Sequence, residues 1–269
     1  MQSQTNCQRH LWILSGTGEG PHIAAAFVKR GWKVTLSVVS DQAAVPYREI
    51  PLQELLIGAL EGSDSIERVL QKARQDHNGF KCVIDATHPF AKEISSNLKN
   101  ACIKQNQKII RFERPFERLT KANLIKSSRA MASLNLSGKR LLIALGSRHL
   151  PEAVFESRKS GAKVFARILP NPTSLRKALM SSLPESHLAL VKPTDKGGLG
   201  ELEAALCRKW SITDVLCKQS GGLVEKIWHE VCEKENIQQW LITRPPLLEG
   251  IEIVNTLSEL IDRLQCFNQ

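Results

Sequence analysis

Apolar residues along the chain fall into two kinds of segment: short continuous runs, and longer stretches in which they recur at helical spacing. The short runs, rich in Val, Ile and Leu, predict strands at Leu11–Ser15, Val34–Val39, Cys82–Asp85, Lys108–Phe112, Leu141–Ala144, Lys163–Ile168, Leu188–Val191, Val215–Lys218 and Trp240–Ile242. The longer stretches predict helices at Ile23–Arg30, Ser65–Gln75, Lys92–Gln105, Pro151–Ser157, Ser174–Ser181, Leu202–Arg208, Val224–Glu235 and Leu257–Leu264. Strands that alternate with helices in this way are typical of βαβ units and a parallel sheet.

The length of 269 residues fits one large domain or two smaller ones. Two smaller sheets suit it better than one wide sheet. We therefore expect an α/β fold of two Rossmann-like, doubly wound parallel-sheet domains with a cofactor and substrate cleft between them. The predicted N-terminal, cofactor-binding domain spans residues 1–125 and the C-terminal, substrate domain spans 126–269. Nothing in the last predicted helix fixes its neighbour, so packing back on the first domain is also compatible with its sequence.

Composition is that of an ordinary globular protein, with 42% hydrophobic and 24% charged residues. The seven cysteines form no C-x-x-C pair, which indicates structural or free thiols and a reducing compartment. The polar start and the short apolar run after it match neither a signal peptide nor a membrane span, so we expect a cytoplasmic protein without membrane contact. The histidines and cysteines lack metal-ligand spacing, and no metal site is predicted.

Basic residues exceed acidic ones, giving a formal net charge of +10, and the excess is concentrated between Lys104 and Arg140. Three interpretations compete: a solvated basic face, a nucleic-acid footprint, and attraction of a polyanionic small molecule. Single-stranded nucleic acid needs aromatic stacking platforms among the basic residues. Only Phe112 and Phe116 lie in this region, and the whole chain has one tyrosine. We therefore expect no nucleic-acid partner.

A glycine-rich turn, Ser15-Gly16-Thr17-Gly18-Glu19-Gly20, follows the first predicted strand and opens a helix. Glycines here let phosphate oxygens approach backbone N–H groups at a helix N-terminus, so Gly16, Thr17, Gly18 and Glu19 are candidate cofactor residues. Pro21 stands where a full G-x-G-x-x-G motif has its third glycine, and such turns also occur in proteins that bind no nucleotide.

The end of the second predicted strand bears on the choice of cofactor. An enzyme for NAD favours an acidic residue here, and one for NADP a basic or hydroxyl residue. Ser37 and Ser40 are candidates for a 2′-phosphate contact, whereas Asp41 opposes it. This favours NADPH, with NADH as the alternative. These residues are also compatible with an ordinary strand end that has no role in cofactor binding.

The run Asp85-Ala86-Thr87-His88-Pro89-Phe90-Ala91 follows the buried strand Cys82–Asp85. Ligands bind at the carboxyl ends of strands in open α/β sheets. Pro89 favours an extended His88 and suits the first turn of the next helix. Asp85, Thr87 and His88 are therefore expected on a loop at the predicted cleft. Considered alone, such a histidine is more often a cap or a packing residue.

This heptapeptide resembles the hallmark of the precorrin-6A reductase family (CobK/CbiJ) of cobalamin biosynthesis. The resemblance extends over nearly the whole chain. Similar segments, in the family's order, are Gly16-Thr17-x-Glu19, Arg111-Phe112-Glu113-Arg114-Pro115, Gly146-Ser147-Arg148, Lys218-Gln219-Ser220-Gly221-Gly222 and Arg244-Pro245. The family often carries a Gly-Arg pair after the second strand, where this chain has Ser40-Asp41.

The resemblance implies NADPH-dependent reduction of one double bond of precorrin-6A, or of its cobalt form, to precorrin-6B. The substrate is a polycarboxylate tetrapyrrole, which gives the basic excess a chemical reason. The expected catalytic residues are His88, Thr87 and Lys218, with the proton coming from His88, Lys218 or water. The expected cofactor residues are Gly16, Thr17, Gly18, Glu19, Ser37, Ser40, Asp85 and Thr87. The expected substrate residues are Arg111, Arg114, Arg148, Lys218, Ser220, Gly221 and Gly222.

Several alternatives stay open at this stage. Each of the three arginines is equally compatible with a surface salt bridge. The nearest rival function is a nicotinamide reductase of another small anion, of the dihydrodipicolinate type, and a more distant one is a basic nucleic-acid-binding protein. We expect a monomer or a homodimer.

Overall fold

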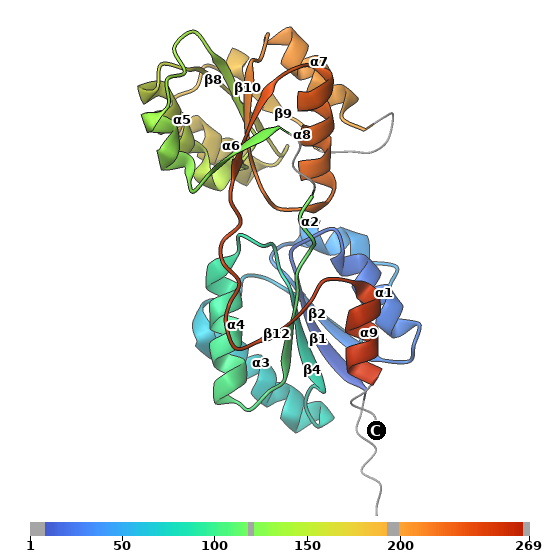
Figure 1. Ribbon diagram of the computed structural model, residues 1–269. Coiled ribbons are helices and arrows are strands. Elements are labelled where there is room, and N and C mark those ends of the chain that lie inside the picture. Colours follow the sequence, from blue (N-terminus) through green and yellow to red (C-terminus); the bar gives the residue numbers. More distant parts are fainter. Residues whose placement is uncertain (1–8, 118–120, 193–198, 266–269) are drawn as a thin grey trace, which may run out of the picture. The chain divides into compact units, whose positions relative to one another are not determined.

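The computed structural model describes residues 9–117, 121–192 and 199–265. These residues form two compact units, whose elements are labelled in Figure 1. The first, called here the N-terminal unit, combines residues 1–115 with 245–269. The second, called the central unit, comprises residues 116–244.

The N-terminal unit is a parallel sheet with helices on both faces. Its elements are β1 (His10–Ser15), α1 (Gly20–Val28), β2 (Lys33–Val38), α2 (Asp41–Ala44), the 3-10 turn η1 (Val45–Tyr47), β3 (Glu54–Ile57), α3 (Gly62–His77), β4 (Cys82–Ala86), α4 (Lys92–Lys104), β5 (Ile109–Phe112), β12 (Glu252–Val254) and α9 (Leu257–Gln265). The strand order is β12-β5-β4-β1-β2-β3, and every pair is parallel.

The central strand β1 shows why this sequence forms a sheet covered on both sides. All six of its residues are buried. Leu11 and Ile13 belong to the core that contains residues of α1 and α9, whereas Trp12 belongs to the core with residues of α3 and α4. Side chains alternate between the faces of a strand, so a continuous apolar run is what a doubly covered strand requires.

The central unit repeats this architecture. Its elements are β6 (Ala122–Ile125), η2 (Ser128–Ser133), β7 (Arg140–Ile143), η3 (Ser147–His149), α5 (Leu150–Lys159), β8 (Lys163–Ile168), α6 (Pro172–Leu179), η4 (Glu185–His187), β9 (Leu188–Leu190), α7 (Glu201–Lys209), β10 (Asp214–Lys218), α8 (Gly222–Lys234) and β11 (Gln238–Ile242). The strand order is β6-β11-β10-β7-β8-β9, again all parallel. The predicted α/β fold of two doubly wound parallel sheets is confirmed.

The two sheets exchange their sixth strands. Five strands have the same relative order in both sheets, and the sixth lies next to β5 in one and next to β11 in the other. The strand that follows β5 in the chain is β6, which pairs with β11 in the central unit. The strand that follows β11 is β12, which pairs with β5 in the N-terminal unit. In Figure 1 the red C-terminal segment accordingly completes the unit built from blue and green residues.

This exchange explains where the predicted domain limits differ from the two units. Residues 116–125 were assigned to the first domain, but β6 is part of the central sheet. Residues 245–269 were assigned to the second, with packing of the last helix on the first domain left open; Leu260 and Leu264 of that helix are fully buried in the core that contains α1 residues. The strands β3, β6 and β12 and the short helix α2 were not predicted.

No helix in the described part of the chain is long and apolar enough to cross a membrane. The described cysteines, Cys82, Cys102, Cys207, Cys217 and Cys232, are all free and buried. The other two, Cys7 and Cys266, lie outside the described residues.

Candidate functional site

The carboxyl edge of the N-terminal sheet has a switch point between β1 and β4. From β1 the chain continues through α1 to β2 on one side, and from β4 through α4 to β5 on the other. Ser15 pairs with Ala86, so the two strands end at the same level. Loops that diverge from neighbouring strand ends leave room for a ligand between them, the usual site in open α/β sheets.

The glycine-rich turn and the heptapeptide meet at this switch point. The Gly16 N–H and the Thr17 hydroxyl both donate to the Ala86 carbonyl, at 3.3 and 3.4 Å. A Cβ atom on Gly16 would stand 3.2 Å from the backbone nitrogen of His88, tighter than ordinary packing allows. A glycine at this position therefore lets the two loops pack this closely without a shift of the His88 backbone.

A buried carboxylate anchors the heptapeptide loop from below. Asp85 is fully buried, and its Oδ1 accepts hydrogen bonds from the Thr87 N–H at 3.0 Å and the Thr87 hydroxyl at 2.7 Å. The same oxygen lies 2.8 Å from Nη1 of Arg111. The Thr87 hydroxyl also contacts the hydroxyl of Ser95 at 3.0 Å. Asp85 and Thr87, predicted as ligand-contacting residues, are thus engaged in a network that fixes the loop.

Arg111 lies inside this network. Its side chain is 7% exposed and pairs with two carboxylates, Asp85 and Glu113. Nε donates to Glu113 at 2.9 Å, and Nη1 donates to Thr87 at 2.9 Å. A buried guanidinium with two anionic partners does not fit the predicted role of a clamp for substrate carboxylates. It fits a residue that holds the loop in place.

His88 is half-buried on the same loop. Its Nδ1 accepts the Phe90 N–H at 3.2 Å, and its carbonyl accepts the Ala91 N–H at 2.8 Å. Because Nδ1 acts as an acceptor, the neutral ring carries its proton on Nε2. The loop therefore fixes the histidine backbone and selects its tautomer.

The glycine-rich turn carries an ion pair. Arg114 donates through Nε and Nη2 to Oε2 of Glu19, at 2.7 and 2.6 Å. The pair joins a predicted substrate residue to a predicted cofactor residue, and it neutralises the one carboxylate on the turn.

The other two glycines of the turn differ in their surroundings. A Cβ on Gly18 would have open space around it, whereas one on Gly20 would collide with the Ser15 and Tyr47 hydroxyls.

The serines at the end of β2 are used within the fold. Ser37 is buried and accepts a hydrogen bond from Nε1 of Trp12 at 2.8 Å. Ser37 is therefore a hydrogen-bond partner of Trp12 inside the core. This does not fit the predicted contact of Ser37 with a 2′-phosphate. Ser40 is exposed and accepts the Ala43 N–H at 3.3 Å, which caps α2. Of the three polar residues considered for the 2′-phosphate contact, Ser40 and Asp41 lie on the surface and Ser37 does not.

The central unit has the corresponding switch point between β7 and β10. The chain leaves β7 through Gly146, which has a φ of 81°, into η3 and α5. It leaves β10 through Ser220 and Gly221 into α8. These two loops contain the remaining predicted substrate residues, Arg148, Lys218, Ser220, Gly221 and Gly222.

Cationic side chains gather at this second switch point. Burial, and next the Arg148 guanidinium, lower the pKa of Lys218 to about 8. The pKa of His149 is also lowered, by burial first and then by Lys218 and Arg148. Such mutual effects require the three groups to lie near one another. The sequence identified Arg148 and Lys218 but not His149, whose only signal was its place next to Arg148.

The turn after β10 is held from several sides. Gly221 has a φ of 68° and donates its N–H to Oε2 of Glu225 at 2.5 Å. The carbonyl of Gln219 accepts a hydrogen bond from Nε of Arg244 at 3.2 Å. Ser220 is buried, and its hydroxyl donates to the Gly221 carbonyl at 3.4 Å. Glu225, which the sequence reasoning missed, is the anchor nearest to the turn.

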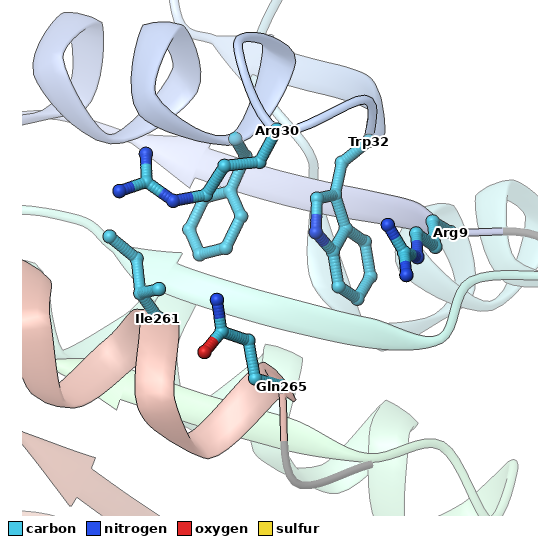
Figure 2. A pocket seen from close by; sticks show the side chains of 6 residues that line it. Arg9, Arg30, Trp32, Ile261 and Gln265 are labelled. Atoms are coloured by element: carbon cyan, nitrogen blue, oxygen red, sulfur yellow. The ribbon is translucent and has the colours of Figure 1, made fainter. Parts of the chain in front are cut away.

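One cavity, of about 400 Å³, lies at the opposite edge of the N-terminal sheet. Figure 2 shows Arg30 from the turn after α1 and Ile261 and Gln265 from α9 around it, with Trp32 and Arg9 alongside. Arg9 and Trp32 stand just before β1 and β2, so the cavity is at the amino ends of the strands. It is separate from the switch point between β1 and β4 of the same unit. The described residues contain no cluster of three or more His, Cys, Asp or Glu that could hold a metal ion.

The family model for precorrin-6x reductase CbiJ/CobK matches residues 10–265. The chain belongs to this family. The predicted family and the predicted reductase class are thereby confirmed. A family of nicotinamide-dependent reductases gives both switch points an interpretation, which is proposed below.

Curated relatives match almost from end to end. The chain is 29% identical over 260 residues to a cobalt-precorrin-6A reductase of Synechocystis sp., covering 93% of this chain and 94% of the relative. It is 26% identical to a cobalt-precorrin-6A reductase of Priestia megaterium, covering 94% and 97%. A precorrin-6A reductase of Rhodobacter capsulatus is 26% identical over 79% of this chain and 78% of that protein. Among solved structures, a CobK precorrin-6A reductase superposes with a TM-score of 0.75 at 22% identity, covering 96% of this chain and 97% of that one.

Proposed function

We propose that this protein reduces one double bond of precorrin-6A, or of its cobalt form, to give the precorrin-6B macrocycle in cobalamin biosynthesis, with NADPH as the reductant. The observation that carries the proposal is the packing of the Gly16 turn against the His88 loop at a switch point, in a chain that belongs to the family. Neither rival function from the sequence has a comparable feature in its favour.

The N-terminal unit is the proposed cofactor unit. A Cβ on Gly16 would crowd the His88 backbone at 3.2 Å, and this close backbone approach fits a turn that cradles a pyrophosphate. Gly16, Thr17 and Gly18 would hold it at the start of α1. Arg114 offsets the charge of Glu19, which would otherwise repel phosphate. When bound, a reduced nicotinamide supplies a hydride to carbon.

NADPH is proposed over NADH because no acidic residue occupies the exposed end of β2 before Asp41. Ser40 offers a hydroxyl at that point, although it also caps α2. Ser37 is not part of the proposal because it is buried. A ratio of kcat/KM values for the two cofactors measures this preference directly.

Within the heptapeptide, we assign different roles to neighbouring residues. Asp85, Thr87 and Arg111 hold the loop, since their polar groups bond to one another. His88 is the residue proposed at the junction of nicotinamide and macrocycle, because its Nε2–H tautomer is selected by the loop. From there it could orient the substrate or deliver the proton that completes the reduction.

The central unit is the proposed substrate unit. Arg148 and Lys218, with the polar side chain of His149 beside them, form a group that suits the acetate and propionate side chains of the macrocycle. A Lys218 with a pKa of about 8 is also a reasonable proton donor near neutral pH. Arg111 and Arg114 are no longer proposed as clamps, because both are paired inside the N-terminal unit.

Anaerobic incubation with precorrin-6A and with its cobalt form, followed through NADPH oxidation, tests the function. Oxidation with neither macrocycle would overturn it.

The His88→Ala variant should lower kcat by about 100-fold, a usual loss for a removed acid–base group, with little change in unfolding midpoint. A fully active variant would make His88 a structural cap.

The cytoplasmic location, the absence of a nucleic-acid partner, and a monomeric or homodimeric state stay predictions.

A further inference from the structure

The turn between β10 and α8 has a backbone conformation that few residues can adopt. Gly221 has φ 68° and ψ 173°, a region populated almost only by glycine, and Gly222 has a φ of 71°. Because these two glycines have no side chains that could pack and hold this backbone conformation, neighbouring residues must stabilise it. This turn directly follows Lys218, the last residue of β10, so its geometry sets where residues 220–222 lie relative to that residue.

Glu225 supplies that support from within α8. Its side chain is fully buried, one helical turn beyond Gly221. Oε2 accepts the Gly221 N–H at 2.5 Å, a short, charge-assisted hydrogen bond. The arrangement resembles a capping box, in which a carboxylate in the first turn reaches back to the N-cap N–H. It fixes the direction in which the turn leaves the sheet.

A buried carboxylate needs a positive partner, and His229 provides it. Nε2 of His229 lies 3.2 Å from Oε1 of Glu225, and Nδ1 lies 2.7 Å from Oε1 of Gln239. The Gln239 amide is oriented by its own nitrogen, which donates to Sγ of Cys217 at 3.3 Å. Both ring nitrogens of His229 therefore face oxygen acceptors, an arrangement that the doubly protonated imidazolium satisfies. In agreement, the hydrogen bond to Glu225 raises the pKa of His229.

We propose that Glu225 is a positioning residue for the substrate-binding turn 218–222, with His229 as its counter-ion. The inference rests on the proposed function for its substrate, but the anchor itself is a property of α8. Glu225 contacts the Gly221 N–H and so acts through the turn. By occupying that N–H, it also leaves recognition of the macrocycle carboxylates to Lys218 and the neighbouring cations.

Steady-state kinetics of the Glu225→Ala variant provide the first test. Loss of the anchor should raise KM for the macrocycle by about tenfold or more, since misplacement of a binding group by about 1 Å can reduce kcat/KM by about 100-fold. KM for NADPH should stay within about twofold, because the proposed cofactor unit is untouched. A variant that is merely less stable would lose active protein and lower kcat without this split. Equal effects on both KM values, or none, would overturn the proposal.

Matched variants sharpen the result. Glu225→Gln keeps an oxygen that can accept the Gly221 N–H, so it should recover most of the loss and stay within about fivefold of the wild type. Glu230→Ala removes an exposed glutamate from the same helix, whose partner Lys226 is 4.0 Å away, and should behave as the wild type. A Glu225→Gln variant as impaired as Glu225→Ala would contradict an anchoring hydrogen bond.

Hydrogen exchange tests the anchor even if turnover is absent. The Gly221 amide should exchange about tenfold or more faster in Glu225→Ala than in the wild type, because a charge-assisted hydrogen bond is lost. Unchanged exchange would overturn the inference. If neither macrocycle is reduced by the wild type but exchange rises in the variant, the anchor stands and the proposed function falls.

Discussion

In the N-terminal unit the loop after β4 rests on a buried Asp85–Arg111 pair, and in the central unit the loop after β10 rests on a buried Glu225–His229 pair. The two sheets share a strand order, and both loops leave them at a switch point. Both anchors are carboxylates that accept a backbone N–H of the loop, from Thr87 and from Gly221. The difference lies in the cation.

A guanidinium stays charged throughout the accessible pH range, whereas an imidazole gains and loses its proton near neutral pH. The anchor of the heptapeptide loop is therefore permanent, and the anchor of the turn 218–222 depends on protonation. Equivalent loops of the two units are thus held in different ways, one by a permanently charged pair and one by a pair that depends on pH. Variants of Arg111 and His229 test this contrast directly, and a variant of the buried His10 tests how the N-terminal unit responds to acid; they follow in order of expected effect.

The largest effect is expected from Arg111→Met. It leaves Asp85 and Glu113 buried without their cation, which typically lowers the free energy of unfolding by about 3–5 kcal/mol. Urea unfolding, combined with hydrogen exchange of peptides from β4 and β5, measures the loss. The control is Lys72→Met, since Lys72 forms an exposed pair with Glu54 at 3.6 Å that should contribute about 1 kcal/mol or less. Equal losses in the two variants would show that the buried pair does not hold the loop.

An intermediate effect on stability is expected when the pH is lowered, through protonation of His10 in the N-terminal unit. His10 is fully buried and donates to or accepts from Thr35 at 2.9 Å, and burial lowers its pKa to about 4. The unfolded chain binds a proton at a higher pH than the folded one. Stability should therefore fall as pH drops from about 6.5 through 4, by up to about 3 kcal/mol.

A series of urea titrations across this range, for wild type and His10→Gln, isolates the contribution. The difference in slope between the two proteins belongs to His10, because the carboxylates are common to both. Parallel slopes would mean that His10 is not protonated on unfolding.

The smallest effect is expected from His229→Gln in the central unit, with the opposite sign. The pKa of His229 is raised, chiefly by Glu225, with further support from Gln239 and Glu117. Its contribution is therefore complete below the unfolded pKa and is lost as pH rises through the folded pKa. Hydrogen exchange of α8 peptides should accelerate with rising pH, beyond its intrinsic pH dependence, in the wild type but not in the variant. Acceleration in both proteins would break the contrast with the Arg111 anchor.

The sequence predicted the interior of the fold better than its edges. Fully buried strands such as β1 and β4 appear as continuous apolar runs, so their burial can be inferred from the local sequence alone. The edge strand β9 was predicted from its apolar run, whereas the edge strands β3, β6 and β12 each span four residues or fewer, are only partly buried and were missed. Without them the strand exchange was invisible, and the domain limits followed chain order instead of sheet membership.

The candidate site shows the same division. The positions of the Gly16 turn and of the heptapeptide follow from local signals, a glycine cluster and a proline at strand ends. The environment of Arg111 does not, because a guanidinium at a strand end points to solvent or into the fold depending on neighbours far away in sequence, such as Ser95. Glu225 and His229 stand four residues apart on a helix, a spacing that surface ion pairs share. Only the buried location of Glu225 separates the two cases.

The exchange of the sixth strands has a consequence for synthesis on the ribosome. Residues 116–244 form a contiguous stretch, so the central unit is complete as soon as it has left the exit tunnel. The N-terminal unit, although made first, lacks β12 and α9 until residues 252–265 have emerged. At about 5–20 residues per second, synthesis from residue 115 to residue 265 takes roughly 8–30 seconds, and during that time the core surface that Leu260 and Leu264 will cover is still open. The half of the molecule translated first is therefore the half that finishes folding last.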